Sequence, residues 1–564
     1  MQSLRRKIRK TASTPRGRIA LLIISLLIVS AIAGGVVYWQ VYRKQIIRER
    51  LESAIRDKTS GLYAVEYDKL TLDEVAGNLS VSNFTLLYDS LHYLRLAKEK
   101  NAPPSLLRVR IPAITVSGVK TPRALLSKEI VGKKLQLDGP EIEIIYTNAG
   151  QDSARNVPTR EVYEQILGNL KLIHIDTLQI FNAKITTRSM RTNRENIRME
   201  GMSVQLTGVS VDSAGWADTS RILFAKELAL SCSKLSLASA NRLYNFSADS
   251  VQTNSTNRQI TVSQFRIDPT LAEDAFVRSL PTQDDRFDFN IRGIDFRHID
   301  IRRLLDERIE ADSLVVRSAT FKIYRDLGIV RDRKNRVGTY PHQALARLSM
   351  PVNIRRMIIG NAFVEYKERS ASTRKAGKVQ FYQTRAVIAN ITNDKQVVQR
   401  DRLMRADIST SFLNQASLQL VWSFYLFHPQ GRFDIKGEMG SIDATMLNVL
   451  AEPMGPARIE EGKVNSLQMN LAGNDYSMSG TVRLLYDNLK VSLLEKDDET
   501  KKLEKKKLAS LAANLVIKNN NPSGKKDDPR VARVTNERNT NRSIFHLSWK
   551  TLFKGIKETA GINK

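Results

Sequence analysis

The sequence predicts a mainly β protein. An N-terminal transmembrane helix is followed by an elongated, repetitive, largely antiparallel β-sheet curled into a groove, with short interspersed helices and a C-terminal amphipathic helix. Three observations lead to this class: one long apolar segment lies near the N-terminus, most of the remaining chain alternates apolar and polar residues, and the alternation recurs at a fixed offset. Because a single core stops growing at about 250–300 residues, a chain of 564 residues needs several domains or an elongated repeat.

The first 42 residues predict a cytoplasmic stub and a membrane anchor. Residues 19–42 contain no charged side chain, and a helix of that length spans about 36 Å, enough to cross the roughly 30 Å hydrocarbon core of a bilayer. Residues 1–18 carry seven Lys and Arg and no acid, so the positive-inside rule places the N-terminus in the cytoplasm and the bulk of the chain beyond the membrane. The apolar segment is longer than a signal-peptide core, which favours an uncleaved anchor over cleavage near Ala31 and Ala33.

This topology changes the meaning of the charge. The chain has 88 Lys and Arg against 59 Asp and Glu, a formal net charge of +29, and seven of these charges belong to the stub. The remaining excess of 22 lies on a body that we predict to be exported, so nucleic acid is not an expected partner. Such a surface suits anionic lipid headgroups, or simply keeps the protein soluble. The single cysteine, Cys232, excludes an internal disulfide framework, so stability depends on packing and backbone hydrogen bonds.

The alternating segments form an internal repeat with an offset of 179 residues. Residues 122–134 and 300–312 each predict a short helix, which is followed by alternating strands that match apolar to apolar. In the first copy Gly139 and Pro140 break the strand, and Ala319 takes the place of Pro140 in the second. Four segments in phase favour one elongated sheet over separate globular sandwiches. The apolar positions that we predict to line a lipid groove are Leu135, Leu137, Ile142, Ile144, Leu178, Ile180, Ile185, Leu314, Val316, Phe321, Ile323, Met357, Ile359, Val364 and Tyr366.

The C-terminal part differs in character. Eleven of the thirteen residues 495–507 are charged, which indicates a solvated linker or an exposed helix face. Further on, apolar residues recur at helical spacing with lysines elsewhere on the cylinder. This helix either contacts a membrane or a membrane-embedded partner, or caps the open end of the sheet. The residues concerned are Phe545, Trp549, Leu552, Phe553, Ile556, Lys550, Lys554 and Lys557.

The sequence contains no pattern that points to chemistry. Its six histidines are never closer than 44 residues, and it has no H-E-x-x-H, phosphate-binding loop or nucleophile elbow. Asp284 and Asp285 are adjacent, so on a strand they would point to opposite faces. We therefore predict no catalytic residue, no metal site and no cofactor. A membrane-anchored envelope enzyme stays as the less favoured alternative, because distant carboxylates can still meet in a fold.

Three segments resemble the AsmA-like family of Gram-negative bacteria, which includes TamB, YhdP and YdbH. They are the basic stub and anchor leading into residues 68–88, the segment 433–494, and the ending LAANLVIKNNNP with SIFHLSWKTLFKGIK, which is similar to Bacteroidota-type members. The resemblance implies a bridge-like lipid transfer protein, with a β-groove in the periplasm that is anchored in the inner membrane. It supplies no catalytic residues, and this chain is much shorter than the longest members.

These observations divide the chain into a stub (1–18), an anchor (19–42), an N-terminal β-groove unit with a short helix (43–150), a repetitive β-groove body (151–430), an AsmA-like C-terminal β region (431–494), and a charged linker with C-terminal helices (495–564). The expected function is to shield lipid acyl chains and to support phospholipid transport to, or assembly of, the outer membrane. The expected partners are phospholipids, the inner membrane, and the outer membrane or one of its proteins. The alternative is a non-enzymatic envelope scaffold or assembly factor with a dry β core.

Overall fold

The computed structural model describes residues 59, 61–73, 76–119, 129–147, 171–212, 215, 218, 220–454, 457–496, 503–505, 518–524 and 526–561. The predicted stub and anchor lie outside these residues. Among the helices that are described, none has both the length and the apolar composition needed to cross a bilayer. The described chain is mainly β and its strand pairing is mostly antiparallel, as predicted. It divides into two compact units, which we describe separately.

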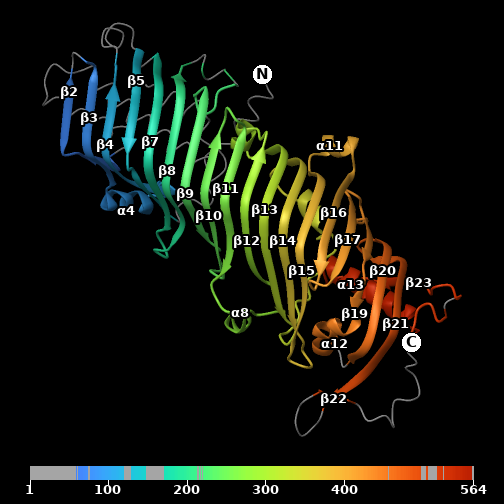
Figure 1. Cartoon of the computed structure of the whole chain (residues 1–564). Coiled ribbons are helices and arrows are strands. Elements are labelled where there is room, and N and C mark those ends of the chain that lie inside the picture. The colour runs from blue at the N-terminus through green and yellow to red at the C-terminus, as the bar shows by residue number, and fades with distance from the viewer. Residues whose placement is uncertain are drawn as a thin grey trace. The chain divides into compact units, whose positions relative to one another are not determined.

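Unit 1 comprises the chain up to residue 264 together with residues 298–308. Its strands are β1 (Tyr63–Glu66), β2 (Lys69–Asp73), β3 (Asn78–Tyr88), β4 (Ser105–Ser117), β5 (Glu129–Asp138), β6 (Glu141–Tyr146), β7 (Leu172–Ser189), β8 (Glu195–Val211), β9 (Glu227–Ala238) and β10 (Tyr244–Asn254), and β11 (Gln259–Pro269) begins in it (Figure 1). Its helices are α4 (Ser90–Lys98) and α9 (Ile301–Leu305). Of the pairs described for this unit, β7 runs parallel to both β5 and β6, and the others are antiparallel. Tyr93 of α4 is buried in a cluster with Leu106 and Ile145.

Unit 2 comprises residues 265–297 and 309–564. Its strands are β12 (Arg286–Arg297), β13 (Ile309–Asp326), β14 (Val352–Arg369), β15 (Ala376–Thr392), β16 (Leu403–Phe412), β17 (Ala416–Tyr425), β18 (Phe433–Met439), β19 (Ile442–Asp443), β20 (Ala457–Gly473), β21 (Ser477–Lys496), β22 (Leu503–Lys505) and β23 (Ala532–Glu537). Its helices are α8 (Glu273–Ser279), α10 (Pro341–Ala346), α11 (Lys395–Arg400), the 3-10 turn η1 (Ala444–Leu447), α12 (Asn448–Met454) and α13 (Ile544–Thr559). Of the pairs described here, β13–β14 is parallel and the others are antiparallel.

The predicted sequence repeat is also a structural repeat. In unit 1, Leu135 of β5 lies beside Leu178 of β7, and in unit 2, Leu314 of β13 lies beside Met357 of β14. Both pairs are parallel and both join residues that are 43 positions apart. The 179-residue offset therefore relates two copies of one arrangement, in which a strand pairs in parallel with the next long strand.

A one-residue change of phase recurs in both copies. The apolar spacing changes once from two to three, between Ile180 and Ala183 of β7 and between Ile359 and Ala362 of β14. The antiparallel pairing with the next strand is irregular at these same two places, and Asn182 has a φ of 51°. An extra residue of this kind is a β-bulge, which bends the strand and strengthens its twist. Because the phase shifts by one, the apolar side chains on both sides of the bulge stay on one face.

Three local expectations were wrong. The predicted helix at 122–134 does not extend over its second half, because β5 begins at Glu129 and pairs in register with β7. In the second copy α9 ends at Leu305 and β13 begins at Ile309, so residues 309–312 are also strand rather than helix. The charged segment 495–507 was expected as a linker or helix face, but its described residues, 495–496 and 503–505, are strand: β21 continues through Lys496, and its end pairs with β22.

The strand break also differs between the copies. Proline has no backbone N–H to donate to a ladder, and Pro140 separates β5 from β6. Ala319 stands at the matching position of β13, which continues unbroken from Ile309 to Asp326. The second copy is therefore the more regular one.

Candidate functional site

Cross-strand pairing aligns apolar side chains over β12–β15 of unit 2. Phe289 of β12 lies opposite Phe321 of β13, Phe321 lies beside Val364 of β14, and Val364 lies opposite Phe381 of β15. The rings of Phe289 and Phe321 meet edge to face with centroids 5.1 Å apart. Two neighbouring rows cross the same four strands: one is Phe296, Leu314, Met357 and Ile388, and the other is Ile294, Val316, Ile359 and Ala386. The half-buried members of the three rows, which we call the open face, are Phe289, Ile294, Phe296, Phe321, Met357, Ile359, Val364, Phe381 and Ile388.

The apolar face of unit 2 is covered over its later strands. Phe412 of β16, Phe433 of β18 and Leu471 of β20 are 9%, 0% and 1% exposed. Leu547 of α13 and Tyr340, the residue before α10, belong to the same buried cluster. Covering by these two helical segments explains why the apolar residues are buried there and only half-buried on the open face.

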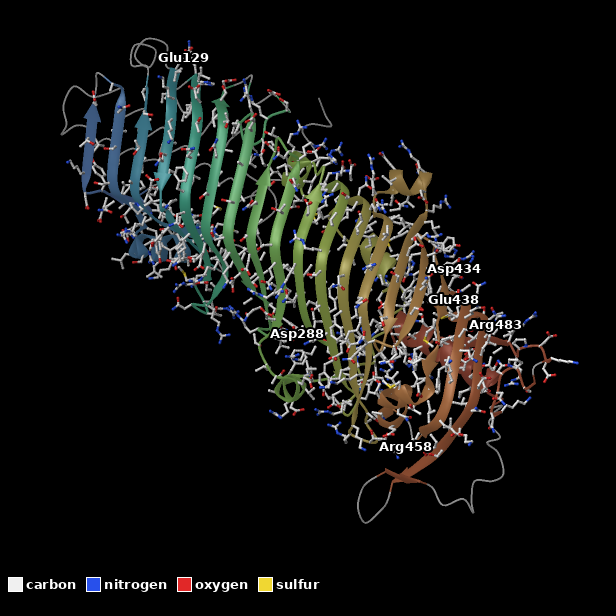
Figure 2. The ribbon with its side chains drawn as sticks, viewed as in Figure 1. Glu129, Asp288, Asp434, Glu438, Arg458 and Arg483 are labelled. Carbon is white, nitrogen blue, oxygen red and sulfur yellow. The ribbon has the colours of Figure 1, made fainter. Side chains whose placement is uncertain are left out.

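The opposite side of these strands is more polar, although Val315, Ile358 and Val387 form a shorter apolar row there and the ring of Phe363 lies 5.0 Å from that of Tyr382. Lys322 of β13 lies opposite Asp288 of β12 and beside Glu365 of β14, which accepts a hydrogen bond from the Gln380 side chain over 2.7 Å. Figure 2 labels Asp288 together with Glu438 and Arg483, which belong to a similar polar row farther along the sheet. The strands therefore separate a mainly apolar face from a more polar one, as the alternation in the sequence predicts.

The structure places the predicted groove residues next to one another. Seven parallel neighbours account for fourteen of them: Leu135–Leu178, Leu137–Ile180, Ile142–Ile185, Leu314–Met357, Val316–Ile359, Phe321–Val364 and Ile323–Tyr366. Ile144, the fifteenth, lies beside Thr187 of β7. The unit 1 members are fully buried, with exposures of 0–4%, whereas Leu314 and Val316 are 7% and 6% exposed and the other unit 2 members are half-buried.

Unit 1 also has a less covered part of its apolar face. Val204 of β8 lies opposite Ile180 and pairs across with Leu230 of β9, and both are half-buried. Leu235 and Phe246, on β9 and β10, are half-buried as well. Burial of the apolar rows in unit 1 therefore decreases from β7 toward β10.

Several residues of the open face were missed from sequence. Phe289 alternates with polar residues on β12 together with its neighbours Phe287 and Ile291, a period-two pattern that could have identified it. Phe381 and Ile388 of β15 gave a weaker signal, because the bulge near Gln383, whose φ is 52°, interrupts the alternation.

The C-terminal helix docks through its small residues. Its buried residues include Thr551, Gly555 and Thr559, and a Cβ at Gly555 would lie 2.5 Å from Val482 of β21. The predicted stripe therefore splits: Leu552 and Ile556 pack against the sheet cluster, whereas the aromatic members are exposed. Exposed fractions are 63% for Phe545, 49% for Trp549 and 47% for Phe553.

The exposed aromatic side chains of α13 continue the apolar face. Phe545 contacts the ring of Trp422 on β17, with centroids 5.6 Å apart, and Trp549 stacks on Phe553 at 6.0 Å. The ammonium of Lys557 lies 5.5 Å from the Phe553 ring, while Lys554 donates to the Thr535 carbonyl of β23, and Lys550 is exposed. The helix thus covers β21 and β23 with one side and presents aromatic and cationic groups on another.

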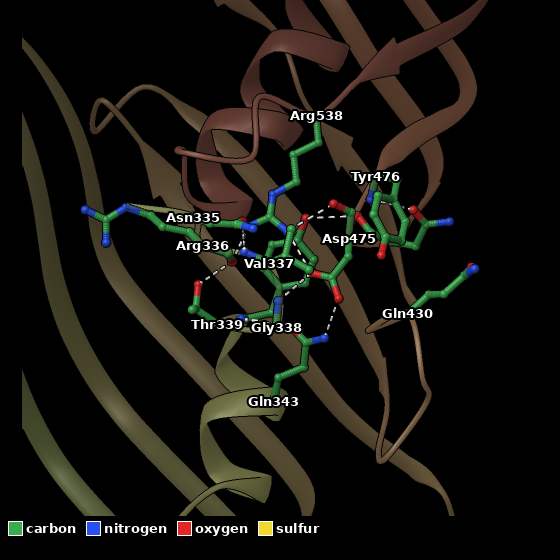
Figure 3. A network of polar contacts seen from close by, with 12 residues as sticks. Asn335, Arg336, Val337, Gly338, Thr339, Gln343, Gln430, Asp475, Tyr476 and Arg538 are labelled. Atoms are coloured by element: carbon green, nitrogen blue, oxygen red, sulfur yellow. Dashed lines mark hydrogen bonds and ion pairs between the residues drawn. The ribbon is translucent and has the colours of Figure 1, made fainter. Parts of the chain in front are cut away.

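A buried ion pair holds the segment that leads into α13 (Figure 3). Arg538 donates to Asp475 over 2.7 Å, and the two side chains are 0% and 3% exposed. Asp475 also accepts from the Gly338 amide at 3.0 Å and from the Gln343 side chain at 2.6 Å. The Arg538 guanidinium lies 4.2 Å from the ring of Tyr340. The β20–β21 turn, the segment before α10 and the segment before α13 are therefore joined at one point.

Among the described residues, no three His, Cys, Asp or Glu side chains are grouped so as to hold a metal ion. Cys232 is buried, and burial raises the pKa of its thiol, which makes it a poor nucleophile. His342 is 1% exposed, and burial lowers the pKa of its imidazole to about 4. What the site offers is an apolar surface bordered by charged groups.

Fold and site together define a β-sheet protein with one mainly apolar face and one more polar face. Comparison with models of known protein families finds no match, and comparison with curated proteins finds none either.

Proposed function

We propose that this protein is anchored in a bacterial inner membrane through residues 19–42 and shields lipid acyl chains in a periplasmic β-groove. It would thereby support phospholipid transport to the outer membrane, or the assembly and homeostasis of that membrane. The observation that carries the proposal is the open face, where nine large apolar side chains on β12–β15 remain half-buried. The predicted anchor and the AsmA-like resemblance favour a lipid as the ligand over a soluble apolar molecule.

The energetics suit an acyl chain. Each methylene group moved from water onto an apolar surface contributes about 0.8 kcal/mol. The rows of Phe, Ile, Val and Met cross four strands, and neighbouring strands lie about 4.8 Å apart, so a chain lying across them contacts side chains along roughly 14 Å. On the opposite face the apolar row of Val315, Ile358 and Val387 spans three strands and ends at Asp295 of β12, so it is shorter than the rows of the open face.

Photo-crosslinking tests this proposal. Benzoylphenylalanine at Phe321 should capture phospholipid when the full chain is purified from membranes in mild detergent. The matched control is the same group at Lys322, the next residue of β13, which is exposed on the opposite face. Equal capture at both positions, or capture at neither, would refute acyl-chain binding on the open face.

The topology has its own test. In a Cys232→Ser background, a single cysteine replaces either Ser3 or the exposed Arg333. A membrane-impermeant maleimide, applied to cells with a permeabilised outer membrane, should label position 333 and leave position 3 unlabelled. The reverse pattern would contradict the proposed orientation.

A second candidate is a non-enzymatic envelope scaffold with a dry β core. The deep burial in unit 1 favours it: Leu135 and Leu137 are 0% exposed, which leaves no room for a ligand at these positions. Benzoylphenylalanine at Leu137 separates the candidates, since a continuous groove predicts lipid capture there as well. Capture at Phe321 alone would confine lipid to part of the sheet, and absence at both positions would favour the scaffold.

The exposed side of α13 is the proposed contact with the far membrane or one of its proteins. Aromatic rings with nearby lysines match an interface between hydrocarbon and anionic headgroups. Flotation with vesicles containing phosphatidylglycerol should recover the full chain, and Trp549→Ala with Phe553→Ala should reduce the recovery several-fold. Unchanged flotation of this double variant would exclude the helix as the membrane contact.

A further inference from the structure

A charged row ends the apolar face of unit 2. Arg325 of β13 and Glu368 of β14 are register neighbours, two residues beyond Ile323 and Tyr366 on the same strands. Because alternate residues of a strand share a face, these charged side chains lie on the apolar side, at the end of its rows. Asp285, which precedes β12, accepts two hydrogen bonds of 2.7 Å from the Arg325 guanidinium.

Two further segments meet at this end of the strands. The Gln283 side chain donates to the carbonyls of Leu327 and Ile329, which holds the loop after β13. Farther along this loop, the amide of Arg336 donates to the Thr540 carbonyl at 2.7 Å. The loop that carries Arg331 and the turn before α13 are therefore joined by hydrogen bonds.

Several positively charged residues lie where the loop after β13 meets the start of α13. Arg542 precedes Ser543, the N-cap of α13, and His546 and Lys550 are four residues apart on one side of that helix. Burial is the main cause that lowers the pKa of Arg542, and the positive charges of Arg331 and Arg325 lower it further. Burial likewise lowers the pKa of His546, and with the positive charges of Arg542, Lys550, Arg331 and Arg325 that pKa falls to about 4. The cations are thus close enough to repel one another.

The nearby carboxylates leave part of this charge unpaired. Asp285 is bound to Arg325, and Glu368 accepts a hydrogen bond of 2.7 Å from the Tyr366 hydroxyl while partly offsetting the repulsion on Arg542. In the part of the chain that the structure describes, Arg331, Arg542 and Lys550 form no ion pair. The Nε of Arg542 is buried without a hydrogen-bond partner.

We propose that Arg331, Arg542 and Lys550 bind the phosphate of a net-anionic phospholipid whose acyl chains lie on the open face. This inference rests on the proposed function. It adds a headgroup preference, because guanidinium and ammonium groups donate charge-assisted hydrogen bonds to phosphate and a net negative charge relieves their mutual repulsion. The end of the apolar rows is where a headgroup would lie if the chains followed them.

Binding of two fluorescent lipids tests the site. Full chain in detergent is titrated with phosphatidylglycerol and phosphatidylcholine that carry the same acyl chains. We expect tighter binding of phosphatidylglycerol. Arg331→Ala with Lys550→Ala, both exposed positions, should weaken it roughly tenfold and leave phosphatidylcholine unchanged. The matched control, Lys322→Ala with Lys378→Ala, removes two exposed lysines from the opposite face and should change neither. Arg542→Ala should act like the first double variant.

The outcomes separate this inference from the proposed function. Equal binding of the two lipids by the unmodified chain would overturn the headgroup site while leaving acyl-chain binding intact. Absence of binding for both lipids would overturn the proposed function together with this site. Inorganic phosphate is the third probe. Its binding is measured once without lipid and once in competition with phosphatidylglycerol. If phosphate binds the lipid-free chain and displaces phosphatidylglycerol over the same range of phosphate concentrations, the site is one for free phosphate, and the lipid assignment is wrong.

Discussion

Substitution of Asp475 by Asn should release the C-terminal helix from the sheet. Asp475 and Arg538 are almost fully buried, so the change leaves the Arg538 guanidinium without its counter-ion. Removing one partner of a buried ion pair costs about 3–5 kcal/mol. The same change disturbs the hydrogen bonds from Gly338 and Gln343, which adds to the loss. Because this junction joins three segments of unit 2, we expect the loss of stability to be local: α13 should separate from the sheet more often while the rest of the unit stays folded.

Amide hydrogen exchange measures that opening. Exchange of the α13 amides, residues 544–559, follows the equilibrium between closed and open helix, so a loss of about 3 kcal/mol accelerates it by roughly a hundredfold. The matched control is Asp407→Asn. Asp407 pairs with Arg405 over 2.7 Å, but the two side chains are 48% and 51% exposed, so that pair is worth less than about 1 kcal/mol.

If Asp475→Asn accelerates exchange of α13 by less than about threefold, or no more than Asp407→Asn does, the buried ion pair does not hold the helix. A third variant identifies the cause. Arg538→Met in the Asp475→Asn background removes the stranded charge, and it should recover part of the protection. Continued fast exchange in that double variant would assign the loss to the Gly338 and Gln343 hydrogen bonds instead.

Three further predictions concern packing, backbone and pH. At Gly555 even an added Cβ would lie 2.5 Å from Val482, so Gly555→Val forces the helix away from β21. The melting temperature, measured by calorimetry, should fall by an amount equivalent to about 1–3 kcal/mol. Gly293→Val should cost roughly 1–3 kcal/mol in the same assay, since Gly293 has a φ of 65° and its Cβ would lie 2.8 Å from that of Arg317. The pKa of His342 is lowered from 6.5 to about 4 in the folded chain, so as the pH falls His342 is protonated in the unfolded chain before it is protonated in the folded chain. Stability should fall as pH drops from 6.5 toward 4, by up to roughly 3 kcal/mol, and His342→Leu should flatten this dependence.

Strand positions and faces were predictable because burial follows the period of two. The repeat could be aligned for the same reason, and the spacing of Leu178, Ile180, Ala183 and Ile185 already contained the bulge as a step of three. The parallel pairing of β7 with β5 and β6 was not predictable from local pattern, since it joins residues about 43 positions apart.

Which apolar rows are covered was beyond the sequence pattern. Leu137 and Phe321 look alike in their strands, but Leu137 is 0% exposed and Phe321 half-buried, since burial depends on segments distant in sequence. The orientation of α13 was missed for a related reason. Apolarity alone singles out the side that carries Trp549, whereas the helix docks where Thr551 and Gly555 allow its backbone to approach the sheet.

Lipid binding on the open face is tested most directly by the phospholipid content of purified full chain carrying Phe321→Asp, measured by mass spectrometry alongside circular dichroism. We expect loss of most bound phospholipid with the fold retained, because a carboxylate on a half-buried surface can still reach water. Lys322→Asp, on the opposite face, should keep its lipid. Unfolding by Phe321→Asp would indicate a dry core, where an unpaired carboxylate costs several kcal/mol. A folded variant that keeps its full lipid content would contradict the open face as the binding surface.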